Sequence, residues 1–249
     1  MPYNPKSAQS AAKMQWRFGG AAIHKVAFPD GVPEGTFAAL LPWKYAKRGT
    51  NQIAPNSQPD AFLKVGVALK DQLICVDQSQ AVVTSNNRVI GVKNVCSTMS
   101  KVVKKYDCSV VDYDGMRSPQ HEVQEVTKII EALNAKPHSA SLLVNCSRRE
   151  NGMLTTYIKG TTLDFFKKNA EFKHAIRKGA NHTWEVISRP QHSLTSRTLM
   201  ETFVLYKSYN PKVRKYGAGI DKGALEPDKW RKAGLKAWAT RQRNAAKNK

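Results

Sequence analysis

The sequence lacks most of the features that assign a chain to a specialised class. It has no run of about 18 to 20 apolar residues, so we expect no transmembrane segment. It has four cysteines but no CxxC or CxxH pair, which argues against a zinc site, and we expect no metal. The phosphate-loop, GxGxxG, HExxH and GxSxG motifs are also absent, so we expect no cofactor.

The cysteines also bear on the compartment in which the protein works. Cys75, Cys108 and Cys146 lie in apolar, β-rich runs, where small buried thiols are expected. Free thiols in a core indicate a reducing environment. We therefore expect an intracellular location in the cytoplasm or nucleus, with the virion or the mitochondrion as alternatives.

Acidic residues are scarce relative to basic ones. The 249 residues contain 40 Lys and Arg against 19 Asp and Glu, giving a formal net charge of +21. In windows of fifty residues the excess falls at the two ends and in the last third of the chain, while residues 51–150 are nearly balanced. Clustered cations displace counterions from a phosphate backbone, so this distribution predicts RNA or another nucleic acid as the partner. Acidic proteins and anionic lipid surfaces remain alternatives.

The spacing of apolar residues and the positions of Pro and Gly predict an α+β fold in three parts. Residues 1–60 are rich in Pro and Gly and are expected to form an irregular basic extension, with one short helix over 7–18. Residues 61–206 are expected to form a mixed α+β core. Residues 207–249 mix cations with tyrosines and tryptophans and are expected to end in a basic helix.

Within the core, two units are expected. Val-rich runs separated by Asn86-Asn87 predict an antiparallel β meander over residues 61–106, since Asn tolerates the positive φ of a tight hairpin. Residues 107–188 give the order β-α-β-β-α-β, which resembles a ferredoxin-like split βαβ sandwich. Its best-defined helix opens with Ser118 as N-cap and Pro119 in the first turn.

Candidate nucleic-acid-binding residues are those that combine cations with aromatic rings or occupy a predicted hairpin tip. Aromatic rings stack on bases and cations contact phosphates. The set comprises Trp43, Lys44, Tyr45, Lys47, Arg48, Arg148, Arg149, Lys212, Arg214, Lys215, Tyr216, Arg231, Lys232, Lys236, Arg241 and Arg243.

The core could also offer a stacking surface. Tyr113 and Tyr157 fall on strands that would be central in the ferredoxin-like unit, where RNA-recognition-motif domains carry stacking aromatics. The Gly- and aromatic-rich fingerprint of that family is missing, so the resemblance is one of element order only.

The sequence offers only weak candidates for catalysis. Asp112 and Asp114 could lie on one face at the end of a strand and hold Mg²⁺ for phosphodiester cleavage, although Asp114-Gly115 also fits an ordinary turn.

We therefore predict a non-enzymatic, largely sequence-independent RNA-binding structural protein of a ribonucleoprotein assembly, such as a viral coat, nucleocapsid, movement or ribosomal-type protein. Self-association would accompany such a role. The alternatives are a metal-dependent nuclease that uses Asp112 and Asp114, and an interaction protein that binds acidic protein or anionic lipid.

Overall fold

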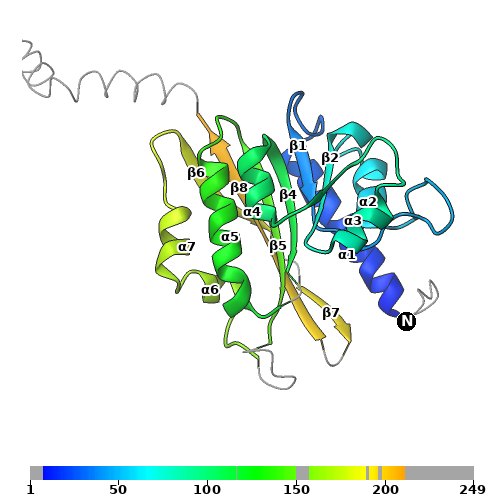
Figure 1. The fold of residues 1–249 in the computed structure, drawn as a ribbon. Coiled ribbons are helices and arrows are strands. Elements are labelled where there is room, and N and C mark those ends of the chain that lie inside the picture. The colour runs from blue at the N-terminus through cyan, green and yellow to red at the C-terminus, as the bar shows by residue number, and fades with distance from the viewer. Residues whose placement is uncertain (1–7, 116, 150–156, 189–190, 196–197, 211–249) are drawn as a thin grey trace, which may run out of the picture.

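A mixed β-sheet organises the part of the chain that the computed structural model describes, which is residues 8–115, 117–149, 157–188, 191–195 and 198–210. The strand order across the sheet is β3-β2-β1-β4-β5-β8-β6, and β7 pairs with β8 beside this path (Figure 1). The strands are β1 (Phe37–Leu40), β2 (Leu73–Asp77), β3 (Lys93–Cys96), β4 (Cys108–Gly115), β5 (Ala140–Ser147), β6 (His182–Ser188), β7 (Gln191–Thr195) and β8 (Thr198–Tyr209).

The first five strands run parallel, whereas β8 pairs antiparallel with β5, β6 and β7. The chain builds outward from β1 through β2 to β3, and then returns to the other side of β1 with β4 and β5. The order of strands therefore reverses between β1 and β4. This arrangement is a doubly wound α/β sheet, and the reversal is its topological switch point.

Helices cover both faces of this sheet. Figure 1 shows α4, α5 and α7 together in front of the central strands, with α1 and α2 on the other side. The helices are α1 (Ala8–Ala27), α2 (Gln58–Val65), α3 (Gln80–Asn86), α4 (Met99–Lys105), α5 (Pro119–Asn134), α6 (Thr162–Phe166) and α7 (Ala170–Ala175), with a 3₁₀ turn at Lys70–Gln72. None of the described helices combines the length and apolarity that a membrane span requires.

Two apolar clusters fill the space between the sheet and these two helical layers. Along β4, Val111 and Tyr113 point into the cluster under α5, while Val110 points into the cluster under α1 and α2. β4 and β5 are buried along almost their whole length. Strands buried on both faces carry apolar residues on both, and the middle of each of these strands does so at Val110-Val111 and at Leu142-Leu143-Val144.

Gly20 lets α1 approach the sheet closely. A Cβ atom at this position would lie 3.0 Å from Cδ1 of Leu143 and 3.7 Å from Oδ2 of Asp112. Gly19 points into open space. The glycine pair that was expected to limit the first helix thus lies within α1, because Gly20 is needed where helix and sheet meet.

The predicted α+β fold is wrong. The ferredoxin-like interpretation of residues 107–188 required an antiparallel sheet, but β4 and β5 pair in parallel through the crossover helix α5. β4 also pairs with β1, which comes from the segment expected to be irregular. A four-residue strand flanked by prolines has little local signal, and its position depends on pairing with distant strands.

The predicted meander over residues 61–106 is also wrong. Leu73–Asp77 is a strand as expected, but the Val-rich segments on either side of it lie in α2 and α3. Asn86 ends α3 and is not part of a hairpin. Short apolar runs fit a buried helix face as well as a strand, and burial against the sheet decided between them. The predicted helix that begins at Ser118 and Pro119 is confirmed as α5.

Candidate functional site

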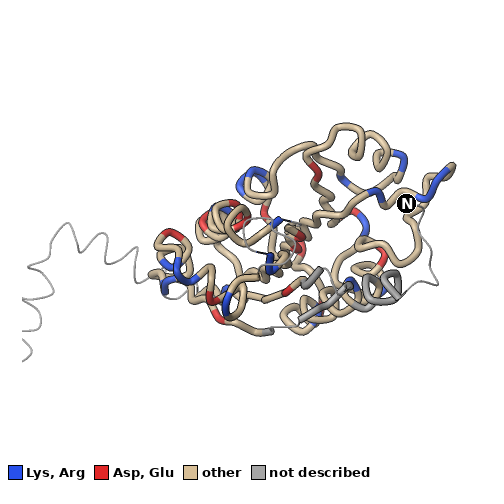
Figure 2. Tube along the Cα trace, turned by 90° about the horizontal axis from the view of Figure 1, so that it is seen from below, with Lys and Arg blue, Asp and Glu red and all other residues tan. Residues whose placement is uncertain are grey.

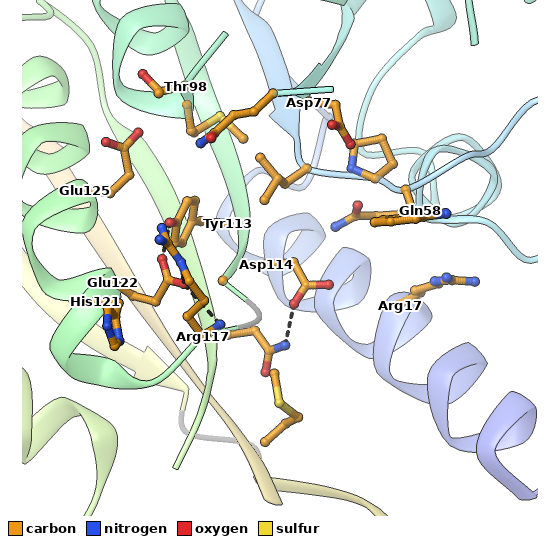
Figure 3. A pocket seen from close by; sticks show the side chains of 18 of the residues that line it. Arg17, Gln58, Asp77, Thr98, Tyr113, Asp114, Arg117, His121, Glu122 and Glu125 are labelled. Atoms are coloured by element: carbon orange, nitrogen blue, oxygen red, sulfur yellow. Dashed lines mark hydrogen bonds and ion pairs between the residues drawn. The ribbon is translucent and has the colours of Figure 1, made fainter. Parts of the chain in front are cut away.

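A pocket of about 940 Å³ opens across the carboxyl ends of the parallel strands (Figure 3). It lies at the switch point, where open α/β sheets bind their ligands. Its volume is within the range of small-molecule and cofactor sites. The residues that line it include Trp16, Arg17, Leu41, Pro42, Trp43, Lys44, Ser57, Gln58, Asp77, Thr98, Met99, Tyr113, Asp114, Gly115, Arg117, Gln120, His121, Glu122, Glu125, Asn145 and Met200.

Asp77 marks the end of β2, the strand next to β1. Its side-chain oxygen accepts a hydrogen bond from the backbone N–H of Ser79 at 2.7 Å, which fixes the turn into α3. The side chain is half-buried, and Figure 3 shows it at the upper wall of the pocket. In doubly wound folds an acidic side chain near this sheet edge holds ribose hydroxyls.

A buried carboxylate network connects β4 to the start of α5. The Tyr113 hydroxyl donates to Oε2 of Glu122 at 2.5 Å, while the backbone N–H and Nε of Arg117 donate to Oε1 at 3.1 and 3.2 Å. Burial, followed by the charge of Glu122, raises the pKa of Tyr113 well above its usual range, so the hydroxyl remains a donor. Gly115 makes room for this carboxylate, since a Cβ there would lie 2.8 Å from Cδ of Glu122.

Asp114 is held by a second relay. Asn145 on β5 donates from Nδ2 to Oδ1 of Asp114 at 2.7 Å, and the Thr202 hydroxyl on β8 donates to Oδ1 of Asn145 at 3.1 Å. Asn145 and Thr202 are buried, whereas Asp114 is half-buried at the pocket wall. The carboxylate therefore faces the pocket in a fixed orientation.

Asp112 lies on the same face of β4 as Asp114 but deeper, against α1. Burial, and then the nearby charge of Asp114, raises the pKa of Asp112 to about 7, against a hydrogen bond with Gln58 that lowers it. Its Oδ1 has no hydrogen-bond partner among the described residues. Asp112 does not line the pocket, so the two weak catalytic candidates lie in different environments. The described residues contain no group of three or more His, Cys, Asp or Glu that could hold a metal ion.

The N-terminus of α2 reaches the pocket but is already capped. Ser57 accepts a hydrogen bond from the N–H of Asp60, and the Asp60 carboxylate accepts one from the N–H of Asn56 at 2.7 Å. The negative charge of Asp60 thus occupies the helix end that would otherwise attract an anion. A phosphate group has no prepared position there.

Two polar atoms of the pocket lining lack a hydrogen-bond partner among the described residues. These are Nε1 of Trp16 on α1 and Oε1 of Gln120 on α5, and both are buried. Buried polar atoms without a partner are uncommon in folded proteins. One donor and one acceptor are thus left in opposite walls of a pocket large enough for a ligand.

The structure places the predicted site residues in three settings. Trp43 and Lys44 line the pocket at its mouth, and Lys47 and Arg48 are exposed on the adjoining loop. Tyr45 also lines the pocket but is buried, and its hydroxyl donates to Asn94 at 2.6 Å.

Arg148 and Arg149 follow β5. Arg148 donates to the carbonyls of Ile158 and Gly160 and forms an ion pair of 3.6 Å with Glu201. The backbone of Arg149 forms an isolated antiparallel β-bridge with Tyr157. Neither arginine is among the residues that line the pocket. The remaining candidates lie outside the described residues: Lys212, Arg214, Lys215, Tyr216, Arg231, Lys232, Lys236, Arg241 and Arg243.

The sequence analysis missed Asp77 and the residues of α5 that form the pocket wall. A signal was present: Asp77 follows the apolar run 73–76 and Asp114 ends the mostly apolar segment 108–113, and carboxyl ends of parallel strands meet at one sheet edge. Figure 2 shows Lys and Arg at many places along the described chain.

Comparison with known proteins gave solved structures alone. No protein-family model and no curated protein matches the chain. A structure titled as an rRNA methylase from Streptococcus thermophilus is similar at 9% identity and a TM-score of 0.40, over 74% of this chain and 93% of that one. M. jannaschii TYW2 in complex with AdoMet is similar at 8% identity and a TM-score of 0.42, over 84% and 78%.

The prediction of a non-enzymatic RNA-binding structural protein is wrong. It assumed that the middle of the chain only supports cationic ends, whereas the middle is a doubly wound sheet with a ligand-sized pocket at its switch point. The viral and ribonucleoprotein interpretations are wrong with it.

Proposed function

We propose that this protein is a methyltransferase that binds S-adenosylmethionine in the switch-point pocket and methylates RNA. The observation that carries the proposal is the position of Asp77 beside a pocket of about 940 Å³ at the carboxyl ends of β1, β2 and β4. An acidic side chain there is suited to the two hydroxyls of a ribose. The ligand class is therefore a nucleoside.

The pocket favours a nucleoside without a pyrophosphate. β1 is followed by Leu41-Pro42-Trp43-Lys44 and not by a glycine-rich turn. The next helix, α2, has its N-terminus capped by Ser57 and Asp60. The usual position of a dinucleotide pyrophosphate, at a helix N-terminus after a glycine-rich turn, is therefore missing.

Charge and apolar surface in the pocket fit an adenosyl sulfonium compound. Leu41, Pro42 and Met99 offer apolar surface to an adenine ring, and Asp77 would hold the ribose. Asp114 supplies a negative charge for a cationic centre. Bound S-adenosylmethionine would supply an electrophilic methyl group on a positively charged sulfur.

The chain's own residues then have definable roles. In methyl transfer an acceptor oxygen or nitrogen forms a bond to the methyl carbon as the sulfur–carbon bond breaks, and the acceptor gives up a proton. Asp114 is oriented by Asn145 and Thr202, so its carboxylate is the base we assign to that proton. The Glu122 network fixes α5 as the facing wall.

RNA as acceptor is supported by the net charge of +21. A surface with this excess of Lys and Arg attracts a phosphate backbone. The acidic residues at the sheet edge would therefore bind the cationic cofactor, and the basic residues outside the pocket would bind the RNA acceptor.

Calorimetric titration of the full chain tests the cofactor. We expect binding of S-adenosylmethionine and no comparable binding of NAD. The Asp77→Asn variant should weaken the first by roughly tenfold to a hundredfold, because a hydrogen bond to a charged group is worth about 1.5–3 kcal/mol. Asp71→Asn, an exposed aspartate outside the pocket, is the matched control.

Methyl transfer is tested with radiolabelled S-adenosylmethionine and unmodified RNA transcripts. Because Asp114 is also assigned to the cationic centre, Asp114→Asn is assayed at saturating S-adenosylmethionine, and label in RNA that is still lost there would support its role as the base. Absence of any binding of S-adenosylmethionine by the parent protein would overturn the proposed function.

A further inference from the structure

Trp43 is an exposed tryptophan held in place by a buried clamp. Its side chain is 74% exposed at the mouth of the pocket. Asn86, at the end of α3 and only 2% exposed, donates to the Trp43 carbonyl at 3.4 Å and accepts from the N–H groups of Tyr45 and Ala46 at 3.0 and 3.2 Å. One buried side chain therefore fixes the backbone at Trp43 and over the three residues that follow it.

The loop beyond Trp43 is ordered as well. Its two sides are joined by hydrogen bonds from Lys47 N–H to the Gln52 carbonyl at 2.9 Å and from Ala54 N–H to the Tyr45 carbonyl at 2.7 Å. Gly49, at φ 74°, allows the tight turn at the tip. The cations Lys47 and Arg48 are thus presented on a closed hairpin-like loop and not on a free coil.

Two segments of the sequence on this side of the molecule carry cations and no acid. Residues 35–59 contain Lys44, Lys47 and Arg48 and no acid, and residues 78–106 contain five further cations and no acid. Arg88, from the second segment, lines a shallow hollow together with Gly49, Thr50, Asn51 and Gln52 of the loop tip. The sheet order places both segments on the β1–β3 side of the molecule.

The exposed ring of Trp43 projects from a segment whose backbone is fixed by Asn86. Base stacking on an aromatic ring contributes about 1–3 kcal/mol per base, and a cationic track beside the ring suits the connecting phosphates. A protein partner would need an acidic surface here. A single strand of nucleic acid has both bases that can stack on Trp43 and phosphates that can contact the cations.

We infer that Trp43 is a stacking platform for a base of single-stranded RNA, with Lys44, Lys47, Arg48 and Arg88 contacting the adjoining phosphates. We call these five residues the Trp43 platform. The inference rests on the proposed function in one respect, because the platform would place the next nucleotide at the pocket mouth. Binding itself does not depend on the cofactor.

The test measures fluorescence anisotropy of a labelled 12-nucleotide single-stranded RNA with the full chain. At about 0.3 M salt, where surface charge is strongly screened, Trp43→Ala should weaken binding roughly fivefold to a hundredfold. Trp43→Phe should recover most of the loss because it keeps a ring. Leu69→Ala removes an apolar side chain that is also exposed, at 68%, from before the start of β2, and should have no effect.

The contribution of Lys47 and Arg48 is measured by the salt dependence of RNA binding. Replacing Lys47 and Arg48 together by Gln should lower the magnitude of the log–log salt slope by about 1.4, since each contact with a single strand contributes about 0.7. Binding of S-adenosylmethionine to this double variant should equal that of the parent, because neither residue lines the pocket.

Three results would overturn the inference. They are a change below twofold for Trp43→Ala, equal binding by Trp43→Ala and Trp43→Phe, or polyglutamate binding that matches RNA and weakens equally in Trp43→Ala. The last outcome would indicate an acidic protein as partner. A parent that binds RNA through Trp43 but fails to bind S-adenosylmethionine would refute the proposed function and leave the platform standing.

Discussion

Asp112 gives the sharpest test of the packing between α1 and the sheet. Burial, aided by the charge of Asp114, raises the pKa of its carboxyl from 3.8 to about 7. Each pKa unit corresponds to about 1.4 kcal/mol, so ionised Asp112 costs the folded state roughly 4 kcal/mol. Asp112→Asn keeps the size of the side chain and removes the charge. We expect the variant to be more stable than the parent at pH 8.

The sign follows from proton binding. Between pH about 4 and 7 the folded protein holds a proton on Asp112 that the unfolded chain has released, so the free energy of unfolding of the parent falls as pH rises through this window. The advantage of Asp112→Asn should therefore be small at pH 4, grow up to pH 7 and then remain constant.

Urea unfolding followed by circular dichroism, at pH values from 4 to 8, measures this difference directly. Asp71→Asn controls for loss of an exposed aspartate, and its difference from the parent should show no such growth. An Asp112→Asn variant that is less stable than the parent at pH 8 would refute the reasoning. It would mean that the ionised carboxylate has partners at its Oδ1 that compensate for burial.

Two further substitutions test other contacts. Lys207, fully buried on β8, donates from Nζ to the carbonyls of Leu133 and Lys136 at the end of α5, and burial lowers its pKa to about 8. The unfolded chain keeps this proton up to about pH 10.5, so the parent should gain stability relative to Lys207→Met between pH 8 and 10 in the same unfolding assay, and parallel curves would contradict this. Gly115→Ala should lower the free energy of unfolding by about 1–3 kcal/mol, because its Cβ would displace Glu122 from Tyr113. Gly19→Ala, which meets open space, should be neutral or slightly stabilising, and equal losses in both variants would argue against a specific clash.

Local signals in the sequence predicted individual elements well. Ser118 and Pro119 mark the start of α5, and the sequence also carries a capping box, Thr161 and Asp164, at the start of α6. Both signals involve residues within one helical turn, so they do not depend on the rest of the fold.

The arrangement of those elements depended on contacts that local signals do not contain. β1 has four residues and its partners are β2 and β4, which lie far along the chain. The run at 73–76 is apolar throughout, and the runs at 108–111 and 140–144 are apolar except for one serine each, which is typical of parallel strands buried on both faces. Interpreting them as antiparallel separated Asp77 from Asp114 and hid the pocket.

Two acid-free segments could not be recognised as neighbours in space for a related reason. Counting in windows of fifty residues averaged the acid-free segments 35–59 and 78–106 with acidic neighbours in sequence. Their proximity follows from the order β3-β2-β1 and could not be seen before the sheet was known.

The central place of β1 has a consequence for how the protein is made. A ribosome releases β1 before either of the strands that hydrogen-bond to it. One edge stays unpaired until β2 at Leu73–Asp77 is made, and the other stays unpaired until β4 at Cys108–Gly115 is made. Sheets closed by such distant pairings form slowly and expose apolar surface in the interval. Nascent chains should therefore depend on chaperones more than their length suggests, and removing the first forty residues should abolish folding rather than trim an appendage.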